Sequence, residues 1–515
     1  MIAKNLKQQT IEKIKFEISE SINMVIKLAK VGGLGDLLYF AHYLHCSRLV
    51  KVAGEVPEDR KDISDLYVRQ LTDAYKYIIQ LLFKHSSNEF LKNKIDNSLI
   101  NVAIVNGLTE LVLGINSKYE ALSFLTIFEK MELLGERNQF IKIDLETVTK
   151  DDRLSKFLNY GERADRENYS VNETVRRKDD FLKHFTDEYE PYKDLFELEF
   201  EITLKDFVEL IDFILDKIQS QIKNSLENVV FFENGRVDIN AYKTIMNIGI
   251  ALFLSKKMLF DKFGKNIKKI IEKLTFKKQE FDEQQLQYNL ISRKPLLDFG
   301  DDFLISPELL LDSLFVNSHY SLLEAGNIKD VYKKRYSSLF LDKISKIAFK
   351  YGYIELTREL ELYDGKKQIG DIDLVLKSSG NHILLVEAKN HNIPLDVYFH
   401  DFEATEKRLE YLRKEWETKV DRRFKHLQKN LPKYGLPETF SYIVISKSPE
   451  ILSHFSKYLV LTPKEFEFWL NKNDVTLTFQ GLHEEFNKIN EKTYTMEQLQ
   501  KMQTDLKTGW KFEME

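Results

Sequence analysis

Two oppositely charged residues close the apolar segment ILLVEAK, residues 383–389. If this segment is a β-strand, side chains two apart share a face, so Glu387 and Lys389 point the same way. The acidic segment before it carries Asp371 and Asp373 at the same spacing. A tight hairpin between the two strands would bring Asp373 close to Glu387. The pattern therefore predicts two carboxylates and an ammonium group at one point of a sheet.

These groups have the chemistry that phosphodiester hydrolysis needs. A hard cation polarises the phosphoryl group and generates hydroxide near neutral pH. Mg²⁺, or Mn²⁺ in its place, takes oxygen ligands and keeps several waters, so Asp373 and Glu387 suffice as side-chain ligands, with the backbone carbonyl of Ala388 as a further one. Lys389 would stabilise the attacking hydroxide or the pentacovalent charge. We expect Asp373, Glu387 and Lys389 to be the catalytic residues.

The stretch GDIDLVLKSSGNHILLVEAKN, residues 370–390, resembles the core of the PD-(D/E)XK, or restriction-endonuclease-like, nuclease superfamily. That pattern is an acid on one strand, a short turn, and (D/E)-x-K at the end of the next, apolar strand. The resemblance makes Asp373 the first acid, Glu387 the second and Lys389 the lysine. It covers residues 327–470, and the proline of the name-giving motif is absent here.

Members of that superfamily often carry another acid on the helix before the strands. Asp342, within LFLDKI, is the best match and a candidate metal ligand, followed by Glu355 and Glu359. The resemblance implies Mg²⁺ or Mn²⁺ as cofactor, double-stranded DNA as substrate and, by analogy with multidomain members, an effector role in prokaryotic antiviral defence. Since a cut through both strands needs two sites, we expect a homodimer or higher homo-oligomer.

Other interpretations remain open at this point. The nuclease-like fold could be catalytically degenerate, leaving a nucleic-acid-binding or scaffold protein, or the substrate could be RNA. For the residues themselves, the competing interpretation is a solvated ion pair between Glu387 and Lys389 at a strand end, which would contribute little to stability.

The elements around these residues follow from apolar periodicity and chain breakers. Asp364-Gly365 predicts a hairpin turn between the first two strands. We expect a helix at 328–349, strands at 354–363, 371–376 and 382–389, a long charged helix at 401–429, strands at 440–446 and 458–461, and a helix at 463–470. This order predicts an α/β domain with an αβββαβ core and a mixed sheet.

The whole chain of 515 residues predicts a multidomain protein. Residues 1–290 space their apolar residues three and four apart, which predicts a mostly α-helical region with a regulatory, sensing or oligomerisation role. Residues 291–326 predict a connecting β-hairpin and helix. Residues 327–475 form the expected nuclease-like domain, and residues 476–515 a tail with a helix.

The long charged helix and its surroundings supply candidates for substrate binding. From Glu403 to Lys433, ten basic residues oppose six acids, which predicts a phosphate-binding face beside the site. The alternative is a solvated helix with ion pairs four residues apart. The candidate substrate-binding residues are Asp371, His391, His400, Lys407 and Arg408.

Two further motifs predict structure only. His42, His45 and Cys46 (HYLHC) lack a second ligand pair, so we expect core packing. GGLG at 32–35 lacks the Lys-Ser/Thr of a phosphate loop and predicts a helix break. The single cysteine and the absence of an apolar run of membrane-spanning length predict a soluble cytoplasmic protein. The net charge of −5 requires any polyanion site to be local.

Overall fold

The computed structural model describes residues 2–52, 61–85, 100–127, 131–134, 140–143, short pieces between 156 and 164, 178–226, 248–283, 290–391, 393–394, 397, 402–472, 474, 478–482 and 511–514. The chain divides into two compact units. Unit 1 comprises Met1–Leu122, Val175–Tyr332 and Gln500–Lys511, and unit 2 comprises Ser123–Thr174, Lys333–Leu499 and Phe512–Glu515. Unit 2 thus includes residues 123–174, which the sequence analysis placed in the N-terminal region.

Long helices open unit 1: α1 (Ile2–Ala29), α2 (Leu34–Val52), α3 (Lys61–His85) and α4 (Val102–Ile127). Because α1 ends before the GGLG motif and α2 begins within it, the predicted helix break is confirmed. Asp36 accepts the backbone N–H groups of Gly33 at 2.8 Å and Asn101 at 2.7 Å. The carboxylate thereby satisfies one backbone donor just before α2 and one just before α4. Among the described residues, no helix is both long and apolar enough to cross a membrane.

The HYLHC motif lies within α2. The side chain of His42 is buried and its ring makes an edge contact with that of Tyr43, as expected for core packing. The side chains of His45 and Cys46 lie outside the described residues.

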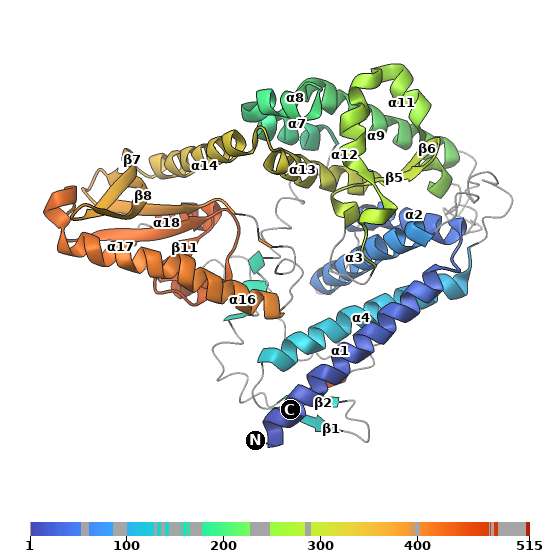
Figure 1. Cartoon of the computed structure of the whole chain (residues 1–515), viewed down its shortest axis with the longest axis horizontal. Helices are drawn as coiled ribbons and strands as arrows, with labels where there is room; N and C mark the ends of the chain where they lie inside the picture. The colour runs from blue at the N-terminus through green and yellow to red at the C-terminus, as the bar shows by residue number, and fades with distance from the viewer. Residues whose placement is uncertain are drawn as a thin grey trace. The chain divides into compact units, whose positions relative to one another are not determined.

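The rest of unit 1 combines helices with a small sheet (Figure 1). The helices are α7 (Lys178–Tyr189), α8 (Lys193–Phe200), α9 (Leu204–Leu226), α11 (Lys256–Phe263), α12 (Lys268–Leu274) and α13 (Pro307–Glu324). The sheet has the order β3 (Phe253–Ser255), β6 (Asp302–Ile305), β5 (Leu296–Phe299) and β4 (Thr275–Phe276). The β-hairpin and helix expected within residues 291–326 correspond to β5, β6 and α13. Gly300 has a φ of 78°, which suits glycine at this turn.

Unit 2 contains a mixed sheet of five strands, in the order β11 (Val460–Leu461), β10 (Phe440–Ser446), β9 (Ile383–Lys389), β8 (Lys367–Ser378) and β7 (Tyr353–Asp364). Strands β7, β8 and β9 pair antiparallel, whereas β9, β10 and β11 pair parallel. The helices are α14 (Lys329–Lys350), α16 (Phe402–Leu412), α17 (Thr418–Lys429) and α18 (Pro463–Lys472). The predicted order of helix, three strands, helix and strand is therefore confirmed, together with the mixed sheet.

Each face of this sheet carries its own apolar core. On one face, side chains of α16 and α17 pack against the sheet, together with Phe157, Tyr160 and Ala164 from the short described pieces between 156 and 164. On the other face, side chains of α14 and α18 pack against it. Burial on both faces explains why β9 and β10 read as nearly continuous apolar runs.

Three strands outside these sheets complete the described elements of the chain. β1 (Met131–Leu134) and β2 (Phe140–Ile143) form an antiparallel pair, and β12 (Lys511–Met514) is the third strand of that sheet. The predicted C-terminal tail with a helix, residues 476–515, lies mostly outside the described residues.

Candidate active site

Strand β9 divides its side chains between the two cores. Ile383 and Leu385 belong to the core under α16 and α17, whereas Leu384 and Val386 belong to the opposite one. Alternation therefore directs both Glu387 and Lys389 to the α16–α17 face. That the two side chains share a face agrees with the prediction from their spacing. Contacts of Glu387 with residues of α17 and β10 agree with this direction.

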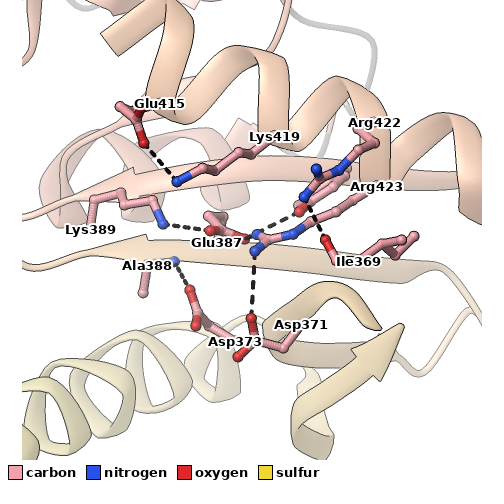
Figure 2. A network of polar contacts seen from close by, with 11 residues as sticks. Ile369, Asp371, Asp373, Glu387, Ala388, Lys389, Glu415, Lys419, Arg422 and Arg423 are labelled. Carbon is pink, nitrogen blue, oxygen red and sulfur yellow. Dashed lines mark hydrogen bonds and ion pairs between the residues drawn. The ribbon is translucent and has the colours of Figure 1, made fainter. Parts of the chain in front are cut away.

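Asp373 and Glu387 meet where the β8–β9 ladder ends. The last pair of that ladder is Leu374 with Val386, so Asp373 and Glu387 are the first residues beyond it. Asp373 Oδ2 instead accepts the backbone N–H of Ala388 at 2.6 Å (Figure 2). The carboxylate thus takes the place of a backbone acceptor, and the expected proximity of Asp373 to strand β9 is observed.

The backbone carbonyl of Ala388 faces the same side of β9 as this hydrogen bond. The carbonyl of Lys389 accepts the N–H of Lys447, on the β10 side, at 2.9 Å. Successive carbonyls of a strand point to opposite neighbours, so that of Ala388 points toward β8. The carbonyl proposed as a metal ligand therefore lies on the side of Asp373.

Both carboxylate oxygens of Glu387 hold cationic partners. Lys389 Nζ lies 2.5 Å from Oε1, and Arg423 Nη1 lies 2.5 Å from Oε2. The hydroxyl of Tyr442 also donates to Oε2, at 3.2 Å. Glu387 is only 4% exposed and Lys389 19%, so their pair is partly buried and not the fully solvated pair considered above.

The two carboxyls have opposite pKa shifts. Burial and the neighbouring charge of Glu387 raise the pKa of Asp373 to about 6, although Lys389 and the Ala388 N–H oppose the shift. Burial also acts to raise the pKa of Glu387, but Lys389 and Arg423 together outweigh it and lower that pKa below its usual range. At neutral pH the site therefore holds two carboxylates, of which Asp373 is the poorly compensated one.

The donor set fits a hard divalent cation. Asp373 and Glu387 supply carboxylate oxygens, and Ala388 supplies a carbonyl on the same side, which are ligands that Mg²⁺ prefers. Repulsion between the carboxylates makes an added positive charge favourable. No group of three or more His, Cys, Asp or Glu side chains suited to a metal occurs in the described part of the chain. Water would therefore complete the coordination of an ion held here.

Arg423 is a residue of this site that the sequence analysis counted only as one of ten basic residues. It comes from α17, is 8% exposed and reaches Glu387, with Asp371 Oδ1 3.5 Å from Nη2. On α17, Val420, Arg423 and Leu427 are the buried residues, at helical spacing. A basic residue on the apolar stripe of an amphipathic helix was the available signal.

Gly370 makes room for that arginine. Its φ is 137°, a conformation that side-chain-bearing residues rarely adopt, and a Cβ there would lie 2.4 Å from Arg423 Nε. The backbone conformation and the nearby guanidinium thus explain why glycine, and no larger residue, stands at position 370.

The other predicted acids lie near β7. Asp342 Oδ1 is 2.6 Å from Arg358 Nη2, and Glu355 also pairs with Arg358. Among the described residues, no hydrogen bond or ion pair joins Asp342 to Asp373. Glu359 lies between the pairs Arg358–Leu374 and Leu360–Ile372, hence opposite Asp373, and has a positive φ of 50°. The metal-binding role of Asp342, and of Glu355 and Glu359 after it, stays a prediction.

The predicted substrate-binding residues have different surroundings. The ring of His391 stacks on that of Trp416, with centroids 6.1 Å apart, and Asp371 lies beside Arg423. Arg408 forms a buried ion pair with Glu450 at 2.6 Å, a structural partner that the sequence analysis did not expect. His400 lies outside the described residues.

The charged segment from Glu403 to Lys433 has features of both a solvated helix with ion pairs and a basic face beside the site. Ion pairs four residues apart are present at Lys407–Glu403, Lys419–Glu415 and Lys425–Asp421. A π-helical turn at Arg413–Glu417 joins α16 to α17 and buries Trp416. Figure 2 shows Lys419 and Arg423 projecting from the same stretch of helix on the side of Glu387 and Lys389. Three of the exposed lysines of this segment are therefore in ion pairs with acids of the same helical segment, while α17 brings basic groups to the site.

Comparisons with protein-family models, with curated proteins and with solved structures find no match to this chain. The interpretation of the site therefore rests on its own geometry.

Proposed function

We propose that this chain is a metal-dependent nuclease that hydrolyses phosphodiester bonds of DNA, and that unit 2 has a restriction-endonuclease-like fold. The observation that carries the proposal is the meeting of Asp373 and Glu387 beyond the end of the β8–β9 ladder, with Lys389 paired to Glu387. An effector role in antiviral defence is part of the same proposal.

Asp373, Glu387 and the carbonyl of Ala388 would hold Mg²⁺ or Mn²⁺. A bound ion would supply an acidified water and a positive charge beside the phosphoryl oxygens. Asp373 holds its oxygens in place through the bond to the Ala388 N–H, so its orientation does not depend on the ion. Prior orientation of this kind removes a cost of binding.

Lys389 would act on the reacting atoms. Its ammonium is paired with the buried carboxylate of Glu387 and is itself partly shielded from water, in a position where a charge interacts more strongly than in bulk solvent. As the water oxygen bonds to phosphorus, the bond from phosphorus to the leaving oxygen breaks, and the leaving oxygen takes up a proton. Negative charge grows on the phosphoryl oxygens in between, and Lys389 would stabilise it.

A cleavage assay tests the proposal directly. Supercoiled DNA, linear DNA and single-stranded RNA would be incubated with the full chain in Mg²⁺, Mn²⁺ or EDTA, beside Asp373→Ala and Glu387→Ala. We expect metal-dependent cutting of DNA that each substitution reduces at least about 100-fold, as expected for loss of a group that acts in the transition state. Lys350→Ala, which opens an exposed ion pair with Glu467, is the control.

The same assay separates the alternatives. Cutting of RNA but not DNA would assign the other substrate. Binding of either nucleic acid without turnover in any metal would favour a degenerate, nucleic-acid-binding protein and would contradict the nuclease proposal.

A further inference from the structure

Arg423 forms an ion pair with Glu387, whose carboxylate is a ligand of the proposed metal site. Its guanidinium contacts Glu387 Oε2 at 2.5 Å, while Lys389 holds Oε1. Figure 2 shows the guanidinium between Glu387 and Asp371, at the side of the site opposite Lys389. An ion bound by Glu387 must therefore compete with two protein cations for the same two oxygens.

We propose that Arg423 neutralises Glu387 in the metal-free protein and is displaced from it when a divalent cation binds, so that Arg423 lowers the metal affinity of the site. This inference rests on the proposed function. In this role Arg423 is a positioning residue that acts through Glu387.

The burial of the pair explains why such a cation is needed. The side chains of Arg423 and Glu387 are 10% and 6% exposed, so the carboxylate has little access to water. A buried charge without a partner is costly, whereas an exchange of one cation for another keeps it compensated. The second charge of a divalent ion would also compensate Asp373, whose carboxylate Arg423 does not contact within the described hydrogen bonds.

Apart from Glu387, Arg423 contacts the hydroxyl of Tyr442 and lies near Asp371, and both are partners that it could keep after leaving Glu387. Its Nε is buried and has no hydrogen-bond partner among the described residues, and its distance to Asp371 is at the limit of a hydrogen bond. Its neighbour Arg422 donates to the carbonyl of Ile369 at 2.6 Å. This second contact holds α17 against the start of β8, so the helix stays in place when Arg423 leaves Glu387.

Titration of Mn²⁺ into the metal-free full chain tests the inference. Removal of the competing cation by Arg423→Gln should raise Mn²⁺ affinity about tenfold, which is modest against the strength of a charged hydrogen bond. Arg423→Lys, which keeps one charge without the planar fork, should fall between the two. Arg163→Gln breaks another buried Arg–Glu pair, with Glu465, and should leave the affinity unchanged.

If Arg423→Gln folds poorly, Arg423→Lys keeps the test valid because it retains the buried charge. Another variant changes the same contact from the side of β8, although it strains the backbone at Gly370. Gly370→Ala retains the charge but places a Cβ 2.4 Å from Arg423 Nε and 2.6 Å from Nη2, which pushes the guanidinium away from Glu387. We expect it to raise Mn²⁺ affinity as well, and to add nothing in the Arg423→Gln background.

The outcomes separate the inference from the proposed function. Unchanged or weaker Mn²⁺ binding by Arg423→Gln, with wild type binding and cutting normally, would overturn the inference alone. If wild type binds no Mn²⁺, or binds it as well as Asp373→Ala does, the metal site itself is wrong and the inference falls with it.

Discussion

The close approach of Asp373 to Glu387 in the candidate site has a cost in stability. Asp373 is held close to Glu387 in a buried environment, and its raised pKa reports that its charged form is disfavoured there. Catalytic groups are often found with pKa values shifted in this way, because burial and like charges create the shift. The conflict is confined to Asp373, since Glu387 has two cationic partners.

Replacement of Asp373 by Asn should stabilise the metal-free protein above pH 6. The native pKa is about 6 and the ordinary value is 3.8. Between these values the native state binds more protons than the unfolded chain, so the stability of wild type falls as pH rises through this window. Asn carries no charge and keeps an acceptor for the Ala388 N–H. The gain should be roughly 1–3 kcal/mol at pH 7.5.

Melting temperatures in EDTA at pH 7.5 and pH 5 measure this effect. The advantage of Asp373→Asn should shrink at pH 5, where wild-type Asp373 is largely protonated. An Asn variant that melts below wild type at pH 7.5 would show that the charge of Asp373 is well compensated, against our electrostatic argument.

At the scale of elements, the sequence predicted those strands and helices that depend on residues close to one another in the chain. The alternation in β9, the hairpin order and the long charged helix follow from residues close in sequence, and each is observed. The proximity of Asp373, Glu387 and Lys389 was predictable because two adjacent strands carry them. Arg423 was not singled out because its contact with Glu387 spans 36 residues and depends on how α17 packs.

The packing of the described pieces between residues 156 and 164 against the rest of unit 2 was also beyond local reasoning. Arg163 makes two hydrogen bonds to Glu465, at 2.5 and 2.6 Å, and a third to the carbonyl of Glu450. Glu465 also accepts the N–H of Thr462 at the start of α18, in a capping box. A buried arginine therefore ties this short segment to a helix some 300 residues away.

Arg163→Ala should destabilise unit 2 by about 3–5 kcal/mol, because it leaves Glu465 buried without its cation. Chemical denaturation followed by circular dichroism measures the loss. Lys350→Ala opens an exposed ion pair with Glu467 of the same helix and should change stability by less than about 1 kcal/mol. Equal effects of the two substitutions would contradict the tie between residues 156–164 and α18.

At the scale of the whole molecule, the division into two units predicts which unit a bound metal ion stabilises. The carboxylates of the site lie in unit 2, whereas unit 1 has its own core, which includes the fully buried Leu259. A ligand stabilises the folded state that binds it. Mn²⁺ should therefore stabilise unit 2, and its effect should require Asp373.

Differential scanning calorimetry of the full chain tests this assignment. Arg163→Ala and Leu259→Ala mark the transitions of units 2 and 1, respectively. We expect Mn²⁺ to raise the melting temperature of the transition that Arg163→Ala lowers, and Asp373→Ala to abolish the shift. A shift of only the transition marked by Leu259→Ala would place the metal outside the candidate site.

The most direct test of the proposed active site is the cleavage rate of Lys389→Ala at saturating Mn²⁺, measured beside its Mn²⁺ affinity. Because Lys389 would act on the reacting atoms and is not a metal ligand, we predict that cleavage falls at least about 100-fold while Mn²⁺ still binds. Full metal-dependent cleavage by Lys389→Ala would contradict the account of this site.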